Sequence, residues 1–133
     1  MESYLLVEAG RIRILLNAIN VRDVIDGCPG GAGDEAAGYR LWRGQILPVK
    51  QLRELIGLER REVRVTVVYS GQEDGQLVLL DVDCVTGLRR IDKSEWSSLP
   101  PLPDGVGGLF DWLVTDNCSG IQLMHLRDGV LAG

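Results

Sequence analysis

The side chains that most often carry catalysis or hold metal ions are few and scattered in this chain. There is one histidine, His125, and there are three cysteines, Cys28, Cys84 and Cys118, with no Cys-x-x-Cys pair. A zinc site needs several thiolate or imidazole ligands at usable spacing, and a nucleophilic cysteine needs a histidine partner. We therefore expect no metal site and no cofactor. His125 is expected to be a packing or surface residue of a strand, and the cysteines to be neither bridged nor catalytic.

A glycine-rich stretch, Gly27–Gly33, has the composition of a phosphate-binding loop but not its sequence. Such a loop continues into a lysine followed by Ser or Thr at the start of a helix. Here Asp34 and Glu35 follow the glycines, and their negative charge would repel a phosphate group. The stretch is therefore predicted to be a mobile surface loop.

Asp81 and Asp83 are the closest approach to a pair of catalytic carboxylates. Residues two apart on a strand share a face, and paired carboxylates can carry acid–base chemistry or bind a cation. On a strand that borders solvent, however, carboxylates are more often simply exposed, and we favour that interpretation here. No other nucleophile, base or cofactor motif is found, so the chain is predicted not to be an enzyme.

The bulk properties fit one globular domain with a packed core, because 133 residues contain 45% hydrophobic and 25% charged residues. A net charge of −5 without a basic stripe argues against a nucleic-acid partner. No apolar run approaches the roughly 18–20 residues of a membrane helix, and the N-terminal residues lack the pattern of a secretory signal. Three scattered cysteines do not form a disulfide framework, which indicates a cytoplasmic location.

Alternation of apolar and polar residues predicts strands joined by short turns, and therefore an all-β fold. Ala9-Gly10 and Ser70–Gly75 read as hairpin turns, and Pro48 indicates an edge or a bulge. Helix is expected only at Leu52–Ile56 and, after a capping box of Asp92 and Glu95, for about one turn. The expected strands are Tyr4–Glu8, Arg11–Leu16, Ile46–Val49, Val63–Tyr69, Gln76–Val82 and Ile121–Leu126.

The two halves of the chain echo each other. Ile14–Asn17 aligns with Val78–Asp81, which places Val21 on Val85, and further on Leu52–Glu54 aligns with Leu126–Asp128. These short matches suit two related small barrels in one chain.

Three segments, taken in order, resemble the CheW-like domains, the coupling proteins of bacterial chemotaxis. Leu41–Leu52, with the sequence LWRGQILPVKQL, resembles the family signature Asn-Leu-Arg-Gly-x-x-x-Pro-x-x-Asp-Leu. Val82–Leu88 resembles the family's Val-Asp-x-Val strand end and the turn after it. Val21–Ile25 resembles its Val-x-Glu-Ile/Val segment, with Asp23 in place of Glu. The order and spacing agree over nearly the whole chain.

This resemblance implies an all-β fold of two small five-stranded SH3-like barrels packed around a shared core, with short helices only. Residues 1–133 would form a single CheW-like domain made of two intertwined barrel subdomains. It also implies a non-enzymatic adaptor without a cofactor and without direct membrane insertion. Its partners would be the cytoplasmic tip of a chemoreceptor and the regulatory domain of a CheA-like histidine kinase, or paralogues of these.

The resemblance also implies a partner-binding site made of Asp23, Val24, Trp42, Arg43 and Gly44. Arg43 matches the arginine of the family's Arg-Gly pair, which is associated with coupling to receptor and kinase. Asp23 and Val24 match a strand associated with the same surface, and hairpin-type pairing would bring them beside Arg43. Trp42 is either a binding hot spot next to Arg43 or a core residue, whereas Trp96 and Trp112 are expected to pack.

The sequence departs from the family pattern at several motif positions, which indicates a divergent member whose partners belong to a chemotaxis array or to another chemosensory pathway. The departures include Leu41, Trp42, Gln51, Leu79 and His125. An alternative function is that of a small-molecule-binding regulatory β-barrel domain without array function, with an apolar ligand inside a barrel or between the barrels.

Overall fold

A computed structural model describes residues 2–26, 38–59, 61, 65–70, 76–102, 106, 108–128 and 131. Within these residues, helix is limited to α1 (Leu52–Leu55) and to the 3₁₀ turns η1 (Ala18–Asn20) and η3 (Lys93–Glu95). The strands are β1 (Glu2–Ala9), β2 (Ile12–Asn17), β3 (Val21–Asp26), β4 (Tyr39–Trp42), β5 (Gln45–Gln51), β6 (Val65–Tyr69), β7 (Val78–Val82), β8 (Cys84–Ile91), β9 (Phe110–Thr115) and β10 (Gln122–Leu126).

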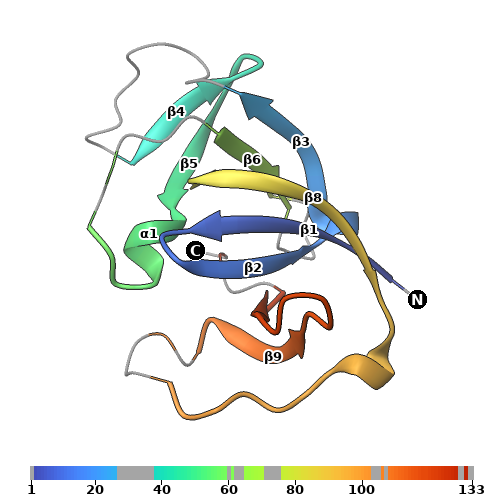
Figure 1. Cartoon of the computed structure of the whole chain (residues 1–133). Coiled ribbons are helices and arrows are strands. Elements are labelled where there is room, and N and C mark those ends of the chain that lie inside the picture. The colour runs from blue at the N-terminus through green and yellow to red at the C-terminus, as the bar shows by residue number, and fades with distance from the viewer. Residues whose placement is uncertain are drawn as a thin grey trace.

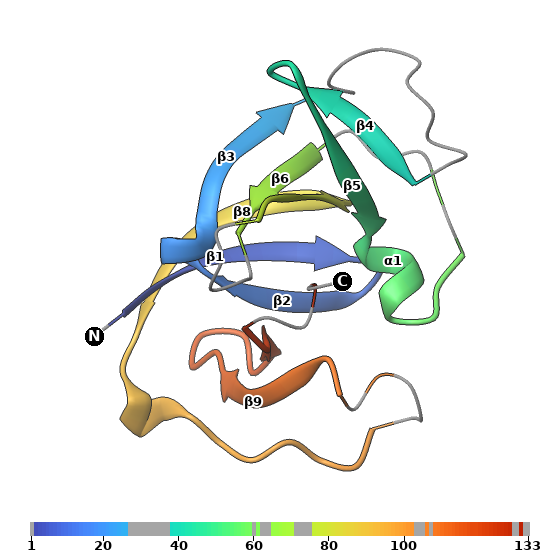
Figure 2. The same ribbon diagram turned by 180° about the vertical axis from the view of Figure 1, so that it is seen from behind.

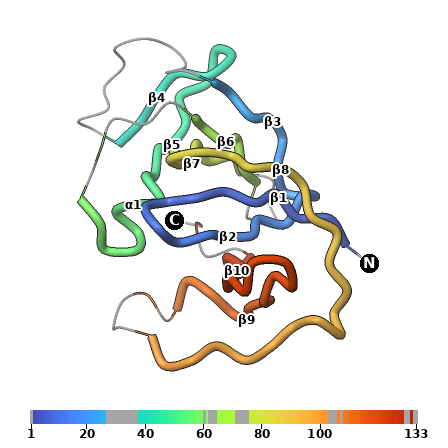
Figure 3. Tube along the Cα trace, viewed as in Figure 1, coloured from blue at the N-terminus to red at the C-terminus, as the bar shows by residue number. Residues whose placement is uncertain are grey.

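The ten strands form two five-stranded sheets. The order in the first sheet is β8-β1-β2-β10-β9, and in the second it is β3-β6-β7-β5-β4. Each sheet is antiparallel except for one pair, β2 with β10 and β5 with β7. Figure 1 shows the second sheet above the first, and Figure 3 traces β7 and β10 within them. The prediction of an all-β fold with two five-stranded units and little helix is confirmed.

The two sheets have the same internal plan, which explains the echo between the halves of the sequence. If β1, β2 and β8 of the first sheet are laid on β6, β7 and β3 of the second, then β10 falls on β5 and β9 on β4. Each half of the chain therefore contributes to both sheets: β1 and β2 share a sheet with β8, β9 and β10, whereas β3, β4 and β5 share a sheet with β6 and β7.

Alternate residues of the central strands serve different cores, because these strands are covered on both faces. On β1, Leu5 and Val7 enter a core shared between the sheets, whereas Tyr4 and Leu6 enter a core of the first sheet alone. On β7, Val78, Leu80 and Val82 face the shared core and Leu79 faces the core of the second sheet. The shared interior that the resemblance implied is therefore present.

The expected strands match the observed ones to within a few residues, and α1 ends one residue earlier than expected, before Gly57 at φ +84°. The capping box of Asp92 and Glu95 is present. Pro48 does not lie on an edge strand: β5 pairs with β4 up to Pro48 and with β7 from Val49 onward. The proline thus occupies the position where β5 changes partner, a place where no amide is needed for the ladder to β7.

Some predictions concern residues that the structure does not describe. The predicted surface loop Gly27–Gly33, with Cys28, lies outside the described residues, as do residues 71–75 of the predicted turn Ser70–Gly75. Among the residues described, no helix has the length and apolar character needed to cross a membrane.

Candidate functional site

The tip of the β4–β5 hairpin holds Arg43 in an unusual backbone conformation. Trp42 pairs with Gln45, which leaves Arg43 and Gly44 as a two-residue turn. Their φ angles are +46° and +78°, and Arg43 is the one non-glycine residue at positive φ among those described. A two-residue hairpin turn of this kind requires positive φ at both central positions, where Asn and Gly are preferred. Arginine here costs about 1–2 kcal/mol of backbone strain.

The side chain of Arg43 contacts two of the other predicted site residues. Its Nη2 lies 3.3 Å from the Asp23 carboxylate, and its guanidinium carbon lies 4.8 Å from the centre of the Trp42 ring. The Arg43 side chain is nevertheless 71% exposed. Contacts of this kind at an exposed site are worth about 0–1 kcal/mol each, so they orient the guanidinium without removing it from solvent.

Asp23 reaches Arg43 by a route other than the hairpin pairing that the sequence indicated. β3 pairs with β6, with an irregular register between Val21 and Asp23, and β4 pairs with β5. β3 and β4 are the two outer strands of the second sheet, and the curvature of that sheet brings their ends together. Figure 2 shows the end of β3 beside the β4–β5 turn. The prediction of hairpin pairing is wrong, but the structure does bring Asp23 and Arg43 together.

The remaining predicted site residues differ in exposure. Trp42 is half-buried and packs against the core of the second sheet while its ring lies under Arg43, so it has features of both interpretations considered for it. Val24 is 40% exposed on β3. Gly44 has open space around its Cα, so its role in the turn is its backbone conformation.

Sequence reasoning missed an apolar stripe on the outer face of the same hairpin. Leu41 pairs with Ile46, and Tyr39 pairs with Pro48. Tyr39, Leu41 and Ile46 are 50%, 49% and 73% exposed. Residues two apart on β4 share a face, and their cross-strand partners share it too. The signal was present in the alternation of β4, but a strand of four residues is too short for that pattern to be recognised.

The inner face of β4 carries a buried ion pair. Arg40 and Asp81, 3% and 2% exposed, are joined by two hydrogen bonds, from Nη1 to Oδ1 at 3.1 Å and from Nη2 to Oδ2 at 2.9 Å. Thr66 donates to Asp81 Oδ1 at 2.7 Å and accepts from Arg40 Nη1 at 3.2 Å. The prediction that Asp81 is solvated is therefore wrong. β7 is a central strand covered on both faces, so neither face borders water.

Asp83 lies beyond the end of β7 and ties three segments together, so it is not merely exposed either. Its Oδ2 accepts from the backbone amide of Gly10 at 2.7 Å and pairs with Arg53 Nη1 at 2.7 Å. Arg53 also donates to the Glu59 carbonyl at 2.9 Å. The carboxylate thus joins the β1–β2 turn, α1 and the crossover between the two sheets, which is a structural role.

His125 is buried in the first sheet, within the alternatives expected for it. Its ring stacks on Trp112 with 4.4 Å between centres, and Trp96 stacks on the far face of Trp112 at 3.9 Å. His125 Nδ1 lies 2.6 Å from Asp111. Trp112 is buried and Trp96 is half-buried against the same core, so both tryptophans pack as predicted.

The two cysteines that the structure describes carry free thiols. Cys84 donates to Glu8 at 3.0 Å, and this hydrogen bond, together with burial, raises the pKa of Cys84 to about 11. Cys118 is exposed. Over the described part of the chain, no three His, Cys, Asp or Glu side chains gather closely enough to hold a metal ion.

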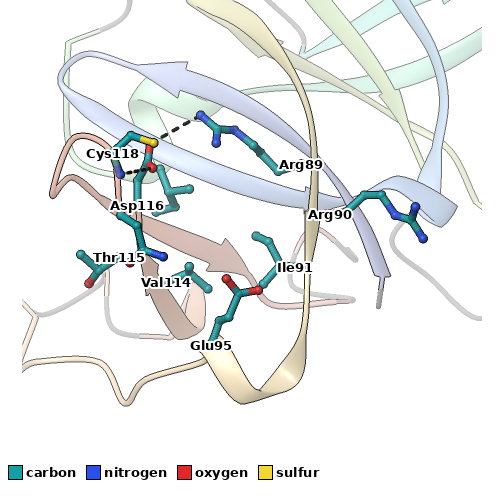
Figure 4. Close-up of a pocket in the computed structure, with 10 residues that line it drawn as sticks. Arg89, Arg90, Ile91, Glu95, Val114, Thr115, Asp116 and Cys118 are labelled. Atoms are coloured by element: carbon teal, nitrogen blue, oxygen red, sulfur yellow. Dashed lines mark hydrogen bonds and ion pairs between the residues drawn. The ribbon is translucent and has the colours of Figure 1, made fainter.

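A small pocket lies between β8 and the segment after β9. It measures about 210 Å³, with Ile91, Val114 and Leu123 among its apolar lining. Figure 4 shows Arg89 turned toward Asp116 and Arg90 pointing away. The amide of Cys118 donates to Asp116 and lowers the pKa of that carboxyl. The pocket is smaller than the roughly 300–1,000 Å³ usual for small-molecule sites, which gives the ligand-binding alternative little support.

Comparisons with known proteins give one consistent result. A family model described as the CheW-like domain matches residues 3–119. The fold is similar to the crystal structure of the scaffolding protein TtCheW from Thermoanaerobacter tengcongensis. The TM-score is 0.73 and the sequence identity 18%, over 95% of this chain and 88% of that chain. No curated protein matches the chain significantly.

Proposed function

The chain belongs to the CheW-like domain family, and from this premise we propose that it is a non-enzymatic signalling adaptor that works by binding alone. Its two partners are the cytoplasmic tip of a chemoreceptor and the regulatory domain of a CheA-like histidine kinase, or paralogues of these in another chemosensory pathway. The proposal places the adaptor in the cytoplasm, where both partner regions lie.

The observation that supports the proposal most strongly is the combination of a strained backbone and an exposed side chain at Arg43. Its backbone is strained at φ +46°, yet its side chain is 71% exposed and its contacts to Asp23 and Trp42 lie at the surface. Surface contacts of this kind offset little of the strain. Backbone strain that is not offset by local stabilising contacts is typical of functional positions. A guanidinium also offers directional, bidentate hydrogen bonds to a partner's carboxylate or carbonyl groups.

The surroundings of Arg43 fit a binding face. We define the coupling face as Asp23, Val24, Trp42, Arg43 and Gly44 together with the outer stripe of Tyr39, Leu41 and Ile46. Exposed apolar side chains beside a charged arginine and a half-buried tryptophan have the composition of an interface centre, since Trp, Tyr and Arg are the residues most enriched at hot spots.

The bridging role is tested with three purified components: the chain, the kinase regulatory domain and a receptor-tip fragment from the same organism. Size-exclusion chromatography with light scattering should give a complex that contains all three. Kinase domain and receptor fragment without the chain serve as the control. Failure of the chain to associate with either partner at tens of micromolar would contradict the proposal.

A further inference from the structure

We propose that Arg40 and Asp81, with Thr66, are positioning residues that hold β4 in the one register and orientation in which the coupling face is formed. The inference rests on the proposed adaptor function, because the coupling face is its object. Arg40 lies on the same four-residue strand as Tyr39, Leu41 and Trp42, but its side chain is buried and bonds to the interior of the second sheet.

Apart from the Arg43-Gly44 turn and the packing of Trp42, β4 has few other restraints. It is an outer strand of its sheet, and its ladder consists of four residue pairs with β5. β5 itself pairs with β7 through only three residue pairs, Val49 to Gln51 with Leu79 to Asp81. A slip of one residue would turn Arg40 outward and place Leu41 in the interior, since side chains on a strand alternate between its faces. Such a slip would also dismantle the outer stripe.

The ion pair opposes that slip more strongly than an apolar contact would. The guanidinium and the carboxylate meet through two parallel hydrogen bonds, and Thr66 contacts both partners. These bonds link β4 to the central strands β6 and β7, which are not its neighbours in the sheet. Apolar side chains of similar size fill the same space without fixing direction, because packing is not directional.

Stability alone does not account for a buried pair of this kind. Taking two charges out of water is costly, and well-packed apolar replacements of buried ion pairs are often neutral or stabilising. A buried pair that adds little stability but fixes register has precedent in polar residues that specify the alignment of packed elements. We therefore expect that removing the pair lowers the affinity for a partner without lowering the stability of the fold.

The test is the double variant Arg40→Leu/Asp81→Val in a Thr66→Val background, which removes both charges together and leaves no buried hydroxyl without its partners. We expect its melting temperature to equal or exceed that of the wild type. We also expect amide hydrogen exchange of Trp42 to be at least about 10-fold faster, and affinity for the kinase regulatory domain to fall by at least about 10-fold. Leu15→Ala, in the core of the first sheet, is the matched control: it should lower the melting temperature and leave affinity unchanged.

Two results would overturn the inference: wild-type affinity in the double variant, or wild-type exchange at β4. If the double variant fails to fold, Thr66→Val alone replaces it, with about 2- to 5-fold effects expected on the same two readouts and unchanged values again counting against the inference. If the wild-type chain binds no kinase domain, the adaptor proposal fails, whereas hydrogen exchange at β4 still tests whether the pair holds the strand.

Discussion

Arg43 Nη2 lies 3.3 Å from the Asp23 carboxylate, although β3, which contains Asp23, and β4, which leads into Arg43, are at opposite edges of the second sheet. The first sheet has a counterpart: Arg89 on β8 lies 3.5 Å from Asp116, the residue that follows β9. β8 and β9 are likewise the outer strands of their sheet. In both sheets, then, an Arg–Asp pair links the two outer strands, and the two charges are exchanged between the corresponding strands.

The Asp23–Arg43 pair is predicted to contribute little to folding. In a double-mutant cycle of Asp23→Asn and Arg43→Ala, monitored by urea unfolding, the coupling free energy should be below about 1 kcal/mol, because both side chains are substantially exposed. A coupling of 2 kcal/mol or more would assign the pair a structural role instead.

The tryptophans are predicted to differ in their contribution to stability. Trp112→Ala removes the centre of a three-ring stack in the core of the first sheet and should cost about 3–5 kcal/mol of unfolding free energy. Trp42→Ala, at a half-buried ring, should cost about half as much or less. Chemical denaturation of both variants measures the difference, and equal losses would mean that Trp42 is a full core residue.

Gly10 is predicted to tolerate a side chain less well than Gly57. Its φ is +62°, and an added Cβ would lie 2.6 Å from Leu58 Cδ1. Gly10→Ala should therefore destabilise the chain by about 1–3 kcal/mol, from backbone strain and the displacement of Leu58. Gly57→Ala is the control, because its φ is also positive but nothing lies within 4 Å of the added Cβ. Equal melting temperatures for the two variants would contradict the account.

The two described cysteines are predicted to react at different rates. At pH 8 the thiol of Cys84, with a pKa of about 11 against an ordinary 9.0, should carry about 100-fold less thiolate than an unperturbed thiol. Iodoacetamide should therefore label Cys118 first, as mass spectrometry of peptides would show. Because the raised pKa favours the thiol form in the folded state, the stability it provides is complete below about pH 9. It is lost as the pH rises through about 11. Comparable labelling rates at pH 8 would be inconsistent with the Cys84–Glu8 hydrogen bond.

The sequence predicted the strands whose alternation is long and regular, such as β2 and β6, and missed those that lack it. β9 follows a proline- and glycine-rich stretch and reads Phe-Asp-Trp-Leu-Val-Thr, with three consecutive apolar residues. β8 contains Gly87 at positive φ and an irregular register against β1. In both strands the side chains on one face do not share a single environment, so the sequence shows no regular apolar–polar alternation.

The differences at the site have another cause, which is contact between residues far apart in the sequence. The sequence favours a solvated Asp81 because strand alternation says nothing of a partner 41 residues away, and for the same reason it gives no sign that Arg40 is buried. The resemblance to the family correctly predicts that Asp23 and Arg43 lie close together. The contact depends on the curvature of a whole sheet, which no local pattern encodes.

Binding of the kinase regulatory domain through the coupling face is tested most directly by calorimetric titration of that domain with three versions of the chain. The wild type should bind, Arg43→Ala should bind about 5- to 150-fold more weakly, corresponding to about 1–3 kcal/mol, and its melting temperature should stay close to that of the wild type. Arg90→Ala, at an exposed arginine on β8, should bind like the wild type. Undiminished affinity of Arg43→Ala, or equal losses in the two arginine variants, would contradict binding through the coupling face.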